Sequence, residues 1–365
     1  MSWWDDGDDD DDGASGYERY EDAVRIRPNP KGNKPRSKLR PDHDDAVEAR
    51  VLGVDRGRYS VLVAEGTPQE REITTTRARE LGRQSIVTGD RVDLVGDVSG
   101  DEGSLARAVR IRERSTLLRR SADDSDDVER VVVANADQML IVVAAANPEP
   151  RARLVDRYLV AAFDAGIQPI LCITKADLAD PAGFAHQFSC LDVPVVTSAQ
   201  GEVPRAELEE LLLGRTTVAV GHSGVGKSTL VNALVPSAKR AIGRVNAVTG
   251  RGRHTSSSTV SLRMRGADGR SGWIIDTPGV RSFGLGHVDP ASVLRSFAAT
   301  AIVPEGAPAQ AVPLHQAHDW EIIERVEAGE LGELGRERLT SLRKLLSALG
   351  EDPAAGLEDV DRSAE

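Results

Sequence analysis

Apolar positions follow two different rhythms along the chain. Between residues 46 and 114, short apolar runs of β type alternate with turns that contain Gly or Asp. Five such runs close together predict a small β-barrel, with an OB-fold as the leading candidate and an SH3-like barrel as the open alternative. The expected strands cover residues 47–54, 58–64, 71–76, 90–96 and 105–112.

From residue 131 the apolar runs alternate with segments of helical periodicity. This alternation is typical of a mostly parallel sheet with helices on both faces, on which ligands bind at the carboxyl ends of the strands. The expected strands cover residues 138–146, 169–174, 193–199, 216–220, 259–265 and 272–276, and the expected helices 153–166, 204–213 and 227–235.

These patterns predict a multidomain α/β protein. Helical spacing returns at residues 319–349, which favours a small helical module after the sheet domain. The predicted segments are a disordered tail at 1–45, the barrel at 46–115, the α/β domain at 116–288, the helical C-terminal module at 289–350 and an acidic tail at 351–365.

Composition adds two points to this division. The chain has 365 residues, 40% hydrophobic but only 4% aromatic, so Val, Leu, Ile and Ala must build its cores. The formal net charge is −12, yet residues 23–41 carry seven Lys or Arg and no acid. Such a basic arm either contacts nucleic acid or is a solvated linker. The acidic run at 5–12 is typical of disorder.

Cysteine usage and the apolar runs bear on the compartment. Only two cysteines occur, and Cys172 lies in an apolar run that predicts a buried strand. This favours a reducing compartment without a disulfide framework. The N-terminus has no signal-peptide pattern, and the longest apolar run, 139–146, is too short to cross a bilayer. We therefore expect a cytoplasmic protein with no membrane partner.

The stretch GHSGVGKS at 221–228 fits the phosphate-binding pattern G-x-x-x-x-G-K-[ST]. A predicted strand runs into it and a predicted helix leaves it, so backbone N–H groups and the helix N-terminus face an anion. Lys227 is expected to reach the β and γ phosphates and to act in catalysis, and Ser228 is expected to bind Mg²⁺. The expected nucleotide contacts here are Gly221, His222, Ser223, Gly224, Val225, Gly226, Lys227, Ser228 and Thr229.

The tetrapeptide DTPG at 276–279 ends the last predicted strand. An Asp at a strand end behind a phosphate loop suits the role of holding Mg²⁺, so we assign that role to Asp276. Gly279 can donate its backbone N–H to the γ-phosphate.

The stretch TKAD consists of Thr174, Lys175, Ala176 and Asp177. It follows a predicted strand, at a position where a nucleotide-base loop belongs. The carboxylate of Asp177 can accept two N–H groups of guanine, a pairing that adenine does not offer, and Lys175 can lie along the base. A surface turn in which Asp177 caps a helix is the alternative. Ser198 and Ala199 follow the next strand, where a backbone N–H can meet the guanine oxygen.

The base loops precede the phosphate loop, the reverse of the usual GTPase order. The order of base loops, phosphate loop, switch and DTPG resembles that of circularly permuted GTPases. With a barrel in front and helices behind, residues 46–345 resemble the ribosome small-subunit-dependent GTPase A (RsgA, or YjeQ) family. The stretches that carry the likeness are TGDRVDL, NADQMLIVVAA, LVDRYLVAA, GHSGVGKSTLVNAL, GRGRHTSS and DTPGVRSF.

The resemblance implies a cytoplasmic GTPase, using GTP and Mg²⁺, that binds the small ribosomal subunit late in its maturation. It also implies that the barrel contacts ribosomal RNA and that the subunit stimulates hydrolysis; we expect a monomer. The chain departs from the family twice. Thr174 stands where the family usually has Asn, and residues 302–318 lack the zinc-binding cysteines, leaving His315 and His318. We therefore expect a zinc-free module.

The switch stretch, residues 239–265, carries seven Lys or Arg and no acid. Thr255 or Ser256 is expected to complete the Mg²⁺ shell, with Thr255 favoured. Val280 occupies the slot of the glutamine that orients water in many GTPases, so His254 is the candidate catalytic group; an RNA-contacting or solvent-facing role is its alternative.

Arg251 and Arg253 are expected to contact RNA phosphates. A P-loop kinase or ATPase, and an RNA-binding assembly factor with slow nucleotide turnover, remain competing interpretations of the whole sequence.

Overall fold

The computed structural model describes residues 43–55, 57–82, 84–101, 103–121, 129–238, 259–277, 288, 293, 321–347 and 349. The chain divides into the units Met1–Asp42 and His43–Glu365, and every described residue belongs to the second. The predicted tails at 1–45 and 351–365 lie outside the described residues, apart from residues 43–45.

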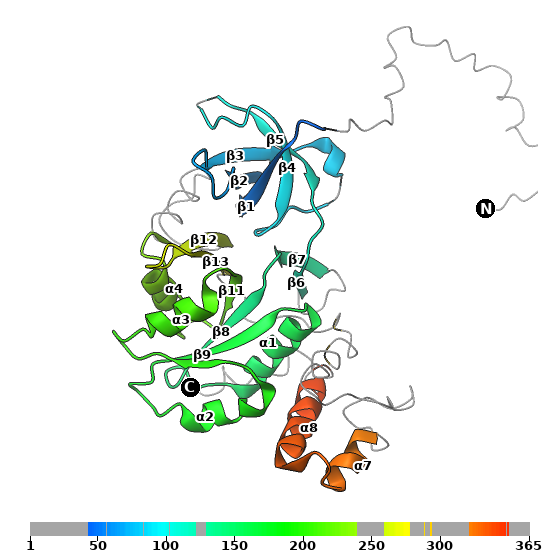
Figure 1. The fold of residues 1–365 in the computed structure, drawn as a ribbon, viewed down its shortest axis with the longest axis vertical. Helices are drawn as coiled ribbons and strands as arrows, with labels where there is room; N and C mark the ends of the chain where they lie inside the picture. The colour runs from blue at the N-terminus through cyan, green and yellow to red at the C-terminus, as the bar shows by residue number, and fades with distance from the viewer. Residues whose placement is uncertain are drawn as a thin grey trace, which may run out of the picture. The chain divides into compact units, whose positions relative to one another are not determined.

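Five strands close into the predicted barrel (Figure 1). They are β1 (Val47–Asp55), β2 (Arg58–Val63), β3 (Arg71–Arg77), β4 (Arg91–Gly96) and β5 (Ala106–Ile111). The strand order is β1-β2-β3-β5-β4, and β4 pairs back with β1. Strand β3 runs parallel to β5, while the other pairs are antiparallel. This closed five-stranded arrangement fits the OB-fold and resolves the alternative that the sequence left open.

Inward-facing side chains of the five strands build the core of the barrel. In β3, Ile73 and Thr75 point into the interior while Glu72, Thr74 and Thr76 face solvent. Apolar side chains from all five strands meet in one buried cluster. All five predicted strands are confirmed to within two residues at each end, because short apolar runs between turns with Gly or Asp mark them in the sequence.

A second group of strands forms the predicted sheet, in the order β10-β9-β8-β11-β13-β12. The strands are β8 (Gln138–Ala144), β9 (Gln168–Thr174), β10 (Val195–Thr197), β11 (Thr216–Val220), β12 (Val260–Arg265) and β13 (Ser271–Asp276). All neighbours are parallel except β12, which runs antiparallel to β13. The carboxyl ends of five strands therefore meet at one edge.

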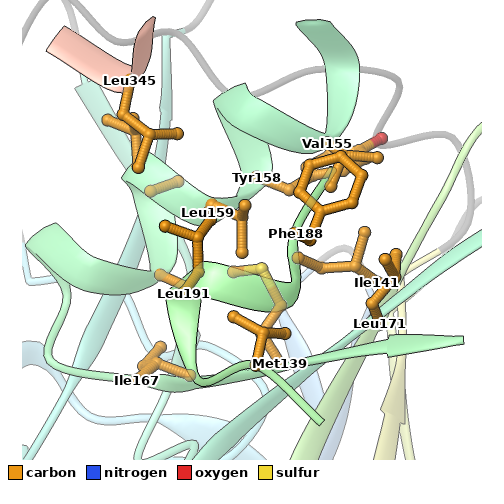
Figure 2. Packing of buried hydrophobic residues seen from close by; sticks show 14 of the residues in the cluster. Met139, Ile141, Val155, Tyr158, Leu159, Ile167, Leu171, Phe188, Leu191 and Leu345 are labelled. Carbon is orange, nitrogen blue, oxygen red and sulfur yellow. The ribbon is translucent and has the colours of Figure 1, made fainter. Parts of the chain in front are cut away.

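Helices cover both faces of this sheet, as the sequence predicts. Met139 and Ile141 pack with α1 (Ala152–Asp164) on one face, where Figure 2 shows Tyr158, Leu159 and Phe188 around them. The neighbouring side chains of β8 point to the other face and pack with α3 (Arg205–Leu212) and α4 (Lys227–Leu234). Strand β8 is buried along its whole length because both faces are covered.

Two C-terminal helices confirm the predicted helical segment. Helix α7 (Glu321–Glu327) leads to α8 (Gly332–Ser347), which packs on α1 and the short η2 turn (Ser189–Leu191). Lys344 of α8 places its Nζ 3.1 Å from Oδ2 of the buried Asp156 on α1. Apolar packing and this ion pair hold α8 against the sheet domain.

The structure contains elements that the sequence did not predict. Strands β6 (Leu117–Ser121) and β7 (Glu129–Ala134) form a separate hairpin, and α2 (Ala182–His186) and η1 (Arg79–Leu81) are short. The two short helices carry too few residues to show a clear period. The domain boundaries at 115/116, 288/289 and 350/351 stay predictions.

The barrel and the second sheet are joined edge to edge. Gly53 of β1 pairs with Val260 of β12, so the strands form one continuous sheet. A second contact lies at the loop before β4, where Thr88 Oγ1 donates to the Thr259 carbonyl over 3.1 Å. This junction was not predicted, because pairing between distant strands leaves no local pattern in the sequence.

Within the described part of the chain, no helix has the length and apolar character needed to cross a membrane. Both cysteines are free and buried, as expected for Cys172. Burial raises the pKa of the Cys172 thiol to about 12, because the thiolate would lose its hydration in the core.

The raised pKa of the Cys172 thiol predicts that the free energy of unfolding decreases at alkaline pH. Above an ordinary thiol pKa of about 8.5 the unfolded chain releases a proton that the folded chain keeps, so stability falls with rising pH. Urea unfolding at pH 7.5 and pH 10 should show a fall about 2 kcal/mol larger in the wild type than in Cys172→Ala. Tyr158, whose pKa burial also raises, is common to both proteins. Equal falls would contradict the assignment.

Candidate nucleotide-binding site

The phosphate loop lies between β11 and α4, as the sequence predicts. The first hydrogen bond inside α4 runs from the Leu230 N–H to the Gly226 carbonyl over 2.9 Å. The N–H groups of Lys227, Ser228 and Thr229 therefore precede the intrahelical bonds, and no side chain caps this end. Free N–H groups at a helix N-terminus, with the positive end of its dipole, form a site for phosphate oxygens.

Glycine is required in this loop for two reasons. Gly224 and Gly226 have φ of +81° and +89°, in the left-handed region. Gly221 lies so close to β8 that a Cβ there would be 2.5 Å from the Val142 carbonyl oxygen. A side chain at any of the three positions would strain or displace the loop that faces the phosphates.

Lys227 and Asp276 meet directly at the carboxyl edge of the sheet. The Nζ of Lys227 forms an ion pair with Oδ1 of Asp276 and donates to the Thr277 carbonyl over 3.4 Å. Thr277 in turn donates its hydroxyl to the Ala219 carbonyl over 2.7 Å. The sequence predicted roles for Lys227 and Asp276 separately, and their pairing brings the phosphate loop and the DTPG strand into one site.

Thr174 joins the base loop to the phosphate loop. Its side chain is buried, and its Oγ1 lies within hydrogen-bond distance of the carbonyl oxygens of Val225 and, at 3.1 Å, Val143. A hydroxyl has one proton, so Thr174 donates to one of these carbonyls at a time. The sequence placed Thr174 in the base loop but missed this contact with the phosphate loop.

The rest of the base loop makes hydrogen bonds to the segments that follow β8 and β10, with Lys175 half-buried. Lys175 has φ of +57°, and its Nζ donates to the Asn147 carbonyl. Asp177 is exposed, and its Oδ1 accepts the Gln200 N–H over 2.8 Å. The bond fixes one oxygen of this exposed carboxylate, and the group can still accept N–H groups from a base.

In the second base loop, Ser198 and Ala199, the backbone N–H groups already have hydrogen-bond partners within the protein. The Ser198 N–H donates to the Ile173 carbonyl over 2.9 Å, and the Ala199 N–H donates to the Glu202 carbonyl over 3.2 Å. A guanine oxygen would therefore have to share or replace one of these bonds. The Ala176 N–H donates to the Ser198 carbonyl over 3.1 Å, which ties the two base loops together.

The donor set suits Mg²⁺ with a nucleotide. Ser228 is exposed on the first turn of α4, next to Lys227, which contacts the carboxylate of Asp276. A hydroxyl and a carboxylate are oxygen ligands of the type that Mg²⁺ takes alongside substrate phosphates. No cluster of three or more His, Cys, Asp or Glu occurs among the described residues.

Several predicted site residues lie outside the described residues. They are Arg251, Arg253, His254 and Thr255 of the switch stretch, Gly279 of DTPG, and His315 and His318 of the C-terminal segment. Their roles stay predictions. His222 and Ser223 are described: Nδ1 of His222 lies 3.0 Å from the Ser223 carbonyl oxygen, within the phosphate loop.

Solved structures share this fold. A crystal structure of YjeQ from Thermotoga maritima matches 84% of this chain and 99% of its own, with a TM-score of 0.56 and 23% identity. YloQ, described as a circularly permuted GTPase, matches 85% of this chain and 98% of its own, with a TM-score of 0.56 and 21% identity. The circularly permuted fold inferred from the motif order is therefore confirmed.

Sequence relatives agree. Proteins named small ribosomal subunit biogenesis GTPase RsgA match from Pseudomonas aeruginosa strain LESB58, 39% identical over 220 residues, and Pseudomonas syringae pv. tomato, 41% over 221 residues. Each match covers 58% of this chain and spans 62% and 61% of the respective relative. The family model for the RsgA GTPase matches residues 111–286. Residues 111–286 of this chain, which hold the phosphate loop behind the base loops, thus match the RsgA GTPase family model.

Proposed function

We propose that the protein is a GTP hydrolase that binds the small ribosomal subunit and acts in its late maturation. The observation that carries the proposal is the meeting of three loops at one sheet edge. Thr174 contacts the phosphate loop at Val225, and Lys227 of that loop pairs with Asp276. The base loop, phosphate loop and DTPG strand thus converge at a single site.

Each group has a role in this proposal. The N–H groups that begin α4 and the ammonium of Lys227 bind the phosphates, while the exposed carboxylate of Asp177 accepts the N–H groups of guanine. Ser228, Asp276 and Thr255 hold Mg²⁺, which would neutralise charge on the phosphate oxygens. His254 positions the attacking water, and Gly279 donates to the γ-phosphate. Lys227 must exchange Asp276 for phosphate when a nucleotide binds.

Residue 177 distinguishes the proposed GTPase from a P-loop kinase or ATPase. A P-loop kinase or ATPase would use the same phosphate loop, but it would gain nothing from a carboxylate at position 177. The bond from the Gln200 N–H holds Asp177 in place in the turn after β9. An oriented carboxylate favours guanine, whose N–H groups it can accept as a pair.

The proposed partner is supported by the names of the sequence relatives, which are small ribosomal subunit biogenesis GTPases. The barrel offers a basic row for its RNA: Arg58 pairs across to Thr76, and Thr76 to Arg107, and all three are exposed. Guanidinium groups on such a row can bind phosphates. We propose further that the protein is cytoplasmic, monomeric and zinc-free.

Asp177→Asn should change the base preference. The amide replaces an acceptor with a donor, so GTP affinity should fall by about tenfold to a hundredfold, the worth of a charged hydrogen bond. The affinity for xanthosine triphosphate should rise, because its base presents an acceptor in place of the amine. Binding of both nucleotides is measured by competition with a fluorescent GDP analogue. Unchanged GTP preference in the variant would exclude Asp177 from base recognition.

Thr174→Val should weaken nucleotide binding, because the phosphate loop loses its contact with the base loop at Val225. We expect GTP affinity to fall about tenfold, since two buried carbonyls lose a shared donor. Thr217→Val is the matched control: Thr217 is equally buried, and its hydroxyl donates to Gln138 over 3.2 Å at the other end of the sheet. Thr174→Asn should retain affinity because an amide offers two donors.

If Thr174→Val and Thr217→Val lower the melting temperature alike and neither affects GTP affinity, Thr174 is only a core residue.

Small subunits should stimulate hydrolysis, and large subunits should not. Stimulation should fall steeply as salt rises, because contacts with RNA phosphates release counterions. Arg251→Ala with Arg253→Ala should lower the ratio of stimulated to unstimulated rate. Arg270→Ala is the control, because Arg270 is an exposed arginine paired with Asp268 in the turn before β13. Salt-independent stimulation, or normal stimulation of the double variant, would refute the role given to these arginines.

A further inference from the structure

Trp273 lies in β13 three residues before Asp276. Its side chain is only 8% exposed, and its backbone N–H donates to the Arg215 carbonyl over 2.8 Å. Successive side chains of a strand point to opposite faces, so Trp273 and Asp276 project from opposite faces of β13. The indole therefore does not contact the nucleotide site, and its surroundings must explain its burial.

Most contacts of the indole come from the barrel. Its Nε1–H donates to Oε1 of Glu65 over 2.8 Å, and the guanidinium of Arg50 lies 4.9 Å from the ring centroid. Leu52 and Leu62 form one buried cluster with it. A Trp in the sheet domain is thus enclosed by side chains of another domain.

Charged groups on this contact are paired. Glu65 accepts from Nε of Arg50 over 3.1 Å and pairs with Nη1 of Arg91 at 2.6 Å. Arg263 of β12 places its guanidinium 4.7 Å from the ring centroid and pairs with Glu70 at 2.6 Å. Burial alone would raise the pKa of Glu65, but Arg50 and Arg91 hold that pKa below its ordinary value, so the carboxylate is charged.

The tryptophan clasp, as we call Trp273 with Arg50, Glu65, Arg91 and Arg263, lies beside a continuous backbone row. Gly53 of the barrel pairs with Val260, and Val260 pairs with Asp276. Only one strand therefore separates the barrel from the strand that carries Asp276. A displacement of the barrel against the clasp would be transmitted along this row.

We infer that Trp273 is a positioning residue: through it the barrel fixes β13 and holds Asp276 where the nucleotide site needs its carboxylate. The inference rests on the proposed role of Asp276 in binding Mg²⁺. It assigns the barrel a part in nucleotide binding besides its proposed contact with RNA. A clasp that only held two domains together would affect stability and leave the magnesium dependence of binding unchanged.

The test measures the affinity of the full chain for a fluorescent GDP analogue, with excess Mg²⁺ and with EDTA. The wild type should bind more tightly with Mg²⁺. In Trp273→Leu, which removes ring and donor, the ratio of the two affinities should fall at least about fivefold. Glu65→Ala should lower the ratio too, whereas Glu65→Gln, which keeps an acceptor for the indole, should restore most of it. Affinity in EDTA should change little in all three.

Ile73→Val is the matched control, because it removes one methyl group from the barrel core away from the clasp. It should lower the melting temperature without changing the ratio. If Trp273→Leu and Glu65→Ala also keep the wild-type ratio, the inference is wrong; should Trp273→Leu fail to fold, Glu65→Ala alone decides it. If the affinity of the wild type for the GDP analogue does not depend on Mg²⁺, the proposed role of Asp276 in binding Mg²⁺ is itself wrong.

Discussion

The parallel register of the central strands is the constraint on which the site depends. Ala144 of β8 pairs with Thr174 at the end of β9, and Ala219 of β11 pairs with Asp276 at the end of β13, so these four strands end at the same edge of the sheet. Loops that leave this edge meet whatever their order along the chain. This is why a base loop that precedes its phosphate loop in sequence still lies beside it, and why a circular permutation preserves the site.

Features set by local chemistry could be predicted from the sequence. The five barrel strands are short apolar runs between turns with Gly or Asp, and the phosphate loop combines glycines, a lysine and a serine at fixed spacing between a strand and a helix. Gly224 and Gly226 adopt the positive φ that makes glycine necessary there. Asp276 could be placed because it ends a strand behind that loop. In each case the physical requirement and the residue lie within one short segment.

Features that depend on distant segments could not be predicted. The hydroxyl of Thr174 reaches Val225, 51 positions later, and Lys227 pairs with Asp276, 49 positions later. The pairing of Gly53 with Val260 joins two domains without any pattern in either strand. Such contacts are selected by packing of the whole chain, which one sequence does not display.

The shared sheet also has a consequence for dissecting the protein. Strand β12 has β13 on one side and the barrel strand β1 on the other. A fragment starting after the barrel would turn β12 into an edge strand with unpaired backbone groups, and would uncover the indole of Trp273. Such an edge is a template for strand addition by another copy, so aggregation would limit work on the isolated GTPase domain. In the full chain, the barrel keeps β12 paired and so protects this edge of the GTPase domain.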